Sequence, residues 1–147
     1  MLSAAVSAAL VMLVAGCSED SGPQVQLKGH NACDLLTKEE LATIGGIMEV
    51  VQDAQEGATS MCSWDAPGPA SHASVVVTLV TDRDNGWIQD KSCDQPIGGL
   101  TSTCKGSNIT VSSGDDKGWI TVTALNTKKS PRAIARTVVA NLKADQG

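Results

Sequence analysis

Apolar and polar positions along this chain follow two different periods, and each period predicts a different element. Thr37 and Glu40 have the spacing of a capping box, and Leu41 and Ile44 continue one apolar face. The glycine pair that follows supplies a left-handed stop. We therefore expect a short helix that begins after Thr37 and ends at this glycine pair.

The middle of the chain shows the two-residue period of β-strands. We expect strands at residues 60–66 (SMCSWDA), around Cys62 and Trp64, and at residues 73–81 (ASVVVTLVT), where β-branched residues crowd together. Residues 108–112 and 119–125 are also β-prone, and the turn-forming cluster at 113–118 between them predicts a hairpin. One face of the second hairpin strand would carry three apolar residues, Ile120, Val122 and Ala124.

The chain closes with a helical pattern. Ser130 is placed as an N-cap, Pro131 fits the first helical position, and apolar residues recur at Ile134, Val138 and Leu142. A short helix, several strands and a second helix together predict an α+β fold. In this fold a small antiparallel sheet packs with an N-terminal short helix and a C-terminal helix.

An uncharged apolar run occupies residues 1–16. As a helix it would span about 24 Å, less than a hydrocarbon core of about 30 Å, so we interpret it as a signal peptide. The run Leu13-Val14-Ala15-Gly16-Cys17 resembles a bacterial lipobox, although no Lys or Arg precedes it. The sulfur of Cys17 would then receive a diacylglyceryl group. The alternatives are a buried helix with a chance cysteine, or a signal peptide cleaved elsewhere.

Polar residues dominate the stretch that follows Cys17. Between residues 18 and 29 the bulky apolar residues are Val25 and Leu27. We therefore expect residues 17–30 to form a lipidated N-terminus with a flexible tether, and residues 31–147 to form a single α+β domain. This organisation predicts a lipid-anchored protein on the extracytoplasmic face of the cell membrane.

Four cysteines remain after Cys17, an even number in an exported chain. Three pairings exist, and we favour the sequential one because each bridge then stays within one half of the domain: Cys33 with Cys62, and Cys93 with Cys104. Redox-active and metal-binding cysteines are the alternatives. The chain contains no C-x-x-C pair, and neither histidine has zinc-ligand spacing from a cysteine, so we predict no metal and a disulfide-stabilised fold.

Charge and motifs exclude several classes of function. The net charge of −5 and an isoelectric point of about 4.8 leave no basic surface for nucleic acid. We find no phosphate-binding loop and predict no cofactor. The acidic body would also be repelled by an anionic membrane, so the lipid on Cys17 would have to hold it there.

Side chains suited to catalysis are few. His30 ends the expected tether and His72 lies in a turn-rich segment, so neither has the setting of a fixed general base. The DRDNG segment at 82–86 departs from the EF-hand pattern. We therefore predict no catalytic residue, and name as ligand-binding candidates the exposed aromatic and basic residues Trp87, Trp119, Arg132 and Arg136.

The segments CDLLTKEELATIGG, CSWDA, GWITVTAL and RAIARTVVANL, behind the lipobox, together resemble the actinobacterial lipoproteins grouped as domain of unknown function 3558. The similarity covers most of the chain after Cys17 but does not place CDQPIGGLTSTC at 93–104. The resemblance implies an envelope-anchored α+β domain with a structural disulfide, and it assigns no chemistry to any residue.

Two classes of function follow, binding without catalysis and enzymatic catalysis. The first is an envelope lipoprotein with a non-enzymatic binding or adaptor role, whose partner would be an envelope protein, a glycan or a lipid. The alternatives are a carrier of lipid or small molecules, or a hydrolase with a site that the sequence does not reveal. A deep apolar cavity would indicate a carrier, and a cleft with convergent polar groups an enzyme.

Overall fold

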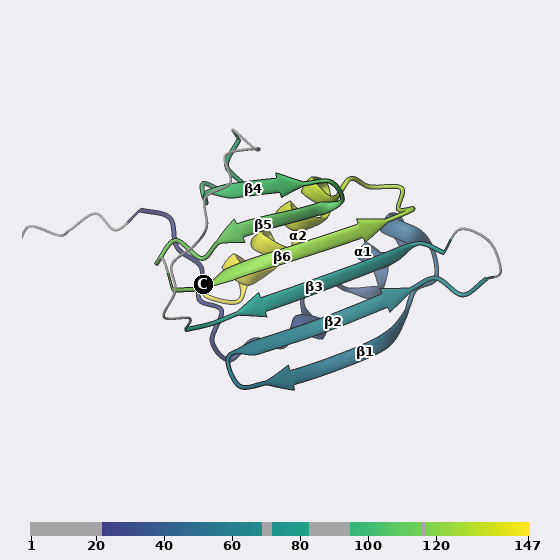
Figure 1. The fold of residues 1–147 in the computed structure, drawn as a ribbon, viewed down its shortest axis with the longest axis horizontal. Coiled ribbons are helices and arrows are strands. Elements are labelled where there is room, and N and C mark those ends of the chain that lie inside the picture. Colours follow the sequence, from purple (N-terminus) through teal and green to yellow (C-terminus); the bar gives the residue numbers. More distant parts are fainter. Residues whose placement is uncertain (1–21, 69–71, 83–94, 116) are drawn as a thin grey trace, which may run out of the picture.

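Six antiparallel strands form one sheet in the computed structural model, which describes residues 22–68, 72–82, 95–115 and 117–147 (Figure 1). The strand order across the sheet is β1-β2-β3-β6-β5-β4. The strands are β1 (Glu49–Glu56), β2 (Thr59–Asp65), β3 (Ser74–Val80), β4 (Ser102–Lys105), β5 (Asn108–Ser112) and β6 (Trp119–Leu125). The predicted hairpin is confirmed, since β5 and β6 pair on either side of the 113–118 turn.

Helices cover one face of this sheet (Figure 1). A 3-10 helix, η1 (Ala32–Asp34), contacts β2 and β3, and α2 (Pro131–Ala144) contacts β5 and β6. The helix α1 (Lys38–Gly45) lies on the same side of the sheet. The α+β class, with a short N-terminal and a longer C-terminal helix, is therefore confirmed.

Both α-helices begin where the sequence predicts, and α1 also ends at the predicted glycine pair. At α1 the Thr37 hydroxyl accepts a hydrogen bond from the Glu40 amide at 3.2 Å, and the Glu40 carboxylate accepts one from the Thr37 amide at 2.8 Å. Gly46 caps the helix with φ of 89°. At α2 the Ser130 hydroxyl accepts from the Ala133 amide at 3.2 Å, with Pro131 in the first turn.

Apolar residues at alternate positions fill the space between sheet and helices. In β3 and β6 the register places Val77 opposite Val122, and both side chains are fully buried. The α2 residues Ile134, Val138 and Leu142 are buried as well. The remaining positions of β2, β3 and β6 face the other side of the sheet and are mostly half-buried. A sheet with one face packed on the core and the other face toward solvent produces this alternation of buried and half-buried residues.

One of the two expected disulfides is seen in full. Cys33 and Cys62 join η1 to β2, with an S–S distance of 1.96 Å. Cys104 on β4 is also disulfide-bonded. Its expected partner Cys93 lies outside the described residues, as does Cys17.

Two strands and one buried segment were not predicted. All eight residues of β1 are exposed or half-buried because neither face of this edge strand is covered, so its sequence shows no alternation. The short β4 falls in the 93–104 segment that the sequence left unassigned. Residues expected as tether also join the domain, since Val25 and Leu27 are only 3% and 5% exposed. The packed part of the chain thus begins before residue 31.

Within the described residues, no helix has the length and apolar character needed to cross a membrane.

Candidate functional site

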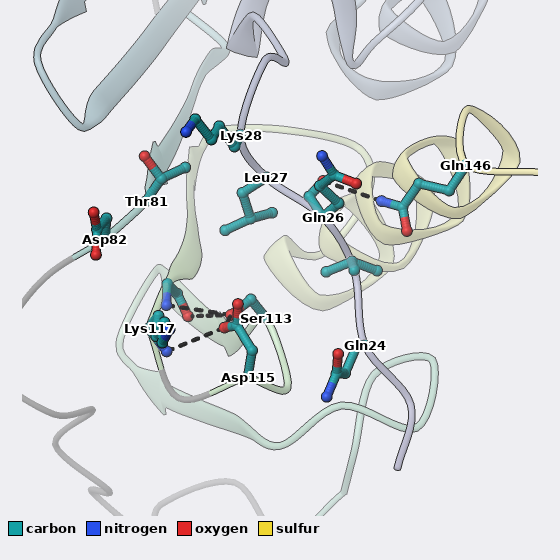
Figure 2. A pocket seen from close by; sticks show the side chains of 12 residues that line it. Gln24, Gln26, Leu27, Lys28, Thr81, Asp82, Ser113, Asp115, Lys117 and Gln146 are labelled. Atoms are coloured by element: carbon teal, nitrogen blue, oxygen red, sulfur yellow. Dashed lines mark hydrogen bonds between the residues drawn. The ribbon is translucent and has the colours of Figure 1, made fainter. Parts of the chain in front are cut away.

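An open groove of about 530 Å³ lies at one end of the sheet (Figure 2). One wall is the extended segment 23–28, which we call the N-terminal strap, and the other is the 113–118 turn between β5 and β6. The residues that follow β3 and the end of the chain complete it. The lining consists of Gln24, Val25, Gln26, Leu27, Lys28, Thr81, Asp82, Ser113, Asp115, Lys117, Gly118 and Gln146.

The N-terminal strap is held on the domain by burial and by hydrogen bonds. Its apolar residues Val25 and Leu27 belong to the core cluster, and the polar residues between and beside them are exposed. The Val25 amide donates to the Ser113 carbonyl at 2.9 Å, and the Gln146 side chain donates to the Gln26 carbonyl at 3.0 Å. This alternation directs apolar side chains into the domain and leaves the polar ones available along the groove.

The opposite wall is a turn with its own hydrogen-bond network. The Ser113 hydroxyl donates to the Asp115 carboxylate and accepts from the Gly118 amide at 3.2 Å. The Lys117 amide donates to the same carboxylate at 3.1 Å. Side chains of Ser and Asp favour turns because they bond nearby backbone groups in this way. Both Ser113 and Asp115 are therefore engaged in shaping the turn (Figure 2).

Glycine at position 114 lets the strap and the turn approach closely. Gly114 has φ of 89°, which lies in the left-handed region. A Cβ atom there would overlap with the Pro23 carbonyl oxygen and would come within 3.1 Å of the Gln24 Cα. Any larger residue at this position would push against the strap.

The Asp115 carboxylate stays ionised at neutral pH. Partial burial raises the pKa of its carboxyl group, but the hydrogen bonds from Ser113 and from backbone amides outweigh burial, so the pKa lies below its ordinary value. A fixed negative charge is therefore part of this wall of the groove.

Charged groups in the lining balance. Lys28 and Lys117 contribute two ammonium groups, and Asp82 and Asp115 contribute two carboxylates. Amides of three glutamines and the Thr81 hydroxyl add neutral donors and acceptors. Across the described part of the chain, the His30 ring lies 3.9 Å from the Asp145 carboxylate, and neither groove lysine is paired with a described carboxylate. The described lining residues thus offer mixed hydrogen-bonding groups with equal numbers of positive and negative charges.

The binding residues suggested by the sequence lie elsewhere. Trp87 is outside the described residues. Trp119 begins β6 and is half-buried, and Arg136 is exposed on α2. The Arg132 guanidinium donates to the carbonyls of Gln95 and Pro96, the latter at 3.2 Å, and so holds the chain before β4. None of the described three lines the groove.

The histidines and acidic residues do not gather into a site. The His72 ring lies 3.2 Å from the Ala66 carbonyl, in an exposed loop, and His30 lies beside Asp145. Neither ring lines the groove. In residues 22–68, 72–82, 95–115 and 117–147, no group of three His, Cys, Asp or Glu is placed to hold a metal ion. Of the DRDNG segment only Asp82 is described.

Fold and groove together define a small α+β domain with an open polar site at one end of its sheet. No family model, no curated protein and no solved structure matches this chain. The resemblance to domain of unknown function 3558 therefore stays a prediction.

Proposed function

We propose that this protein is a lipid-anchored lipoprotein of the cell envelope that binds its ligand without catalysis, and that the groove is the binding site. The observation that carries the proposal is an open groove of about 530 Å³ whose two walls are fixed by the fold. A volume of this size is within the range of small-molecule sites. Envelope proteins, glycans and lipids all remain within the expected class of partner.

The state of the polar groups favours binding over catalysis. The hydroxyl of Ser113 is already hydrogen-bonded to Asp115 and to the Gly118 amide. A nucleophile needs an effective base within hydrogen-bond reach. The two histidines lie outside the groove lining, and the Asp115 carboxylate that accepts from Ser113 is a weak base because hydrogen bonds lower its pKa. The exposed amides and lysines, by contrast, are suited to contact a ligand directly.

The packed interior also favours a surface site over a carrier cavity. Residues between sheet and helices are almost completely buried and belong to one contiguous core cluster. Space for a ligand is found at the end of the sheet instead. A binding protein therefore fits the described structure better than a carrier that encloses an acyl chain.

Native mass spectrometry of the protein extracted from its own envelope tests this proposal. The matched variants are Gln24→Trp, which places an indole in the groove, and Gln52→Trp, which places one at an exposed position of β1. We expect a bound molecule on the wild type and on Gln52→Trp, and its loss from Gln24→Trp. Retention by Gln24→Trp would contradict a binding role for the groove.

A further inference from the structure

We propose that the groove recognises a neutral, hydroxyl-rich group, a sugar carried as the head group of an envelope lipid. This inference rests on the proposed function, because it requires both the anchor on Cys17 and the groove as binding site. It goes further by naming the chemistry of the ligand and the place where the groove meets it.

The lining determines the chemistry. Among the described lining residues, two ammonium groups and two carboxylates cancel, so these residues give an ion of either sign little net attraction. The amide side chains of Gln24 and Gln26 each provide two N–H donors and an acceptor, and both are exposed. A sugar needs this mixture, because each of its hydroxyl groups both donates and accepts. A phosphate or carboxylate ligand would need donors alone.

The short connection to Cys17 determines how far the groove can lie from the membrane. The strap lies close to Gly99 and Gly114 from Pro23 onward, and six residue steps separate Pro23 from Cys17. These steps span at most about 22 Å when fully extended. The groove wall that begins at Gln24 must therefore stay within about 25 Å of the anchored sulfur. Lipid head groups occupy the layer next to that anchor.

The orientation of the sheet places the groove at the near end. The groove lies where β5 ends and β6 begins, which is also the end of β3. Figure 1 shows the strap at this end of the sheet. The opposite end, with the start of β3 and the end of β6, is farther away by the length of a seven-residue strand, about 23 Å. A membrane-borne ligand would thus meet the end of the sheet that holds the groove before it meets the opposite end.

The test uses the full isotope-labelled chain in phosphocholine micelles, followed by NMR of its backbone amides. The micelles are doped with digalactosyl diacylglycerol or with phosphatidylglycerol, and a third arm adds free digalactose without a doped lipid. We expect the glycolipid to shift the amides of residues 24–28 and 113–118. We expect free digalactose to shift the same amides with a weaker affinity, because it lacks the local concentration that the micelle gives.

Variants separate the groove from general micelle effects. Gln24→Ala with Gln26→Ala removes two exposed amides and leaves the Gln26 carbonyl that Gln146 contacts. We expect this pair to weaken glycolipid binding about tenfold, the effect of losing two hydrogen bonds of ordinary strength. Gln52→Ala on β1 is the matched control and should bind as the wild type does.

Every outcome that differs from these expectations would contradict a different part of the proposal. If phosphatidylglycerol shifts the groove amides and the glycolipid does not, the ligand is not a neutral sugar, although the groove is still a binding site. Equal affinity for free digalactose and glycolipid would overturn the lipid source. Shifts outside the groove, or shifts that survive Gln24→Ala with Gln26→Ala, would overturn the site itself. If none of the three probes shifts any groove amide, the sugar head group is wrong, while the ligand found by native mass spectrometry still decides the proposed function.

Discussion

At the scale of single residues, the Ser113 and Asp115 pair shows how a turn can depend on one carboxylate. The Asp115 carboxylate accepts hydrogen bonds from the Ser113 hydroxyl and the Lys117 amide, and its pKa is lowered in the folded protein. A carboxyl with a lower pKa in the folded than in the unfolded state stabilises the fold at pH values above its unfolded pKa. This stabilisation disappears as the pH falls through the folded pKa.

Asp115→Asn should therefore lower the melting temperature by a few degrees at neutral pH, and by less as the pH falls through the acidic range. The asparagine keeps the shape and one acceptor but removes the charge that strengthens the hydrogen bonds. Because Asp115 is exposed, solvent limits the effect. Thermal unfolding followed by circular dichroism at several pH values measures it. Asp53→Asn, at an exposed position of β1, is the control. A pH-independent loss in Asp115→Asn would show that charge is not the cause.

At the scale of elements, the N-terminal strap is the part of the fold that the groove needs most. Gly114 packs against it so closely that a Cβ atom would overlap with Pro23. Gly106 in the β4–β5 turn also has positive φ, 60°, but a Cβ there would meet nothing within 4 Å. Both glycines would resist substitution for conformational reasons, and contact with the strap is the feature that distinguishes them.

Gly114→Ala should consequently loosen the strap, whereas Gly106→Ala should not. Each substitution forces an alanine into the left-handed region, at a cost of about 1–2 kcal/mol. In Gly114→Ala the strap must also move away from the turn. Hydrogen exchange of the Val25 amide, which bonds the Ser113 carbonyl, reports that movement. We expect it to exchange about tenfold faster in Gly114→Ala than in Gly106→Ala. Equal exchange in the two variants would mean that the close contact does not hold the strap.

Sequence patterns revealed some elements and not others for physical reasons. The capping box at Thr37, the Pro131 start of α2 and the alternation around Val122 are local signals, and each produced the expected element. The edge strand β1 lacks such a signal because neither of its faces is covered. The strap is missed since Val25 and Leu27 are two apolar residues in a polar stretch, and their burial depends on a turn some 90 residues later.

The groove itself could not be predicted from the sequence. Its lining comes from the strap, the end of β3, the 113–118 turn and the C-terminus, which are adjacent only after folding. The residues that the sequence suggested were chosen as exposed aromatic or basic groups, a criterion that ignores where the strands end. The alternation Gln24 to Lys28, with polar residues on either side of two apolar ones, is the one local signal that was available.

At the scale of the whole molecule, the strap changes how an anchored domain would behave. With a tether of fourteen residues, as expected for residues 17–30, the domain would move freely above the membrane. Since the chain already contacts the domain at Pro23, beside Gly99 and Gly114, six residue steps remain, and their reach is at most about 22 Å. A lipid on Cys17 would then hold one end of the sheet near the surface.

Lipidation of Cys17 is the condition for this arrangement. Cys17→Ala should leave the protein unprocessed or release it from the membrane, whereas Ser18→Ala, one residue away, should keep it in the membrane fraction. A diacylglyceryl group supplies the two chains that stable anchoring needs, so its loss cannot be replaced by the acidic body of the protein. Fractionation followed by intact-mass analysis measures both properties. A wild-type protein with no acyl mass on Cys17 would remove the anchor, and with it the reason for placing the groove at the membrane surface.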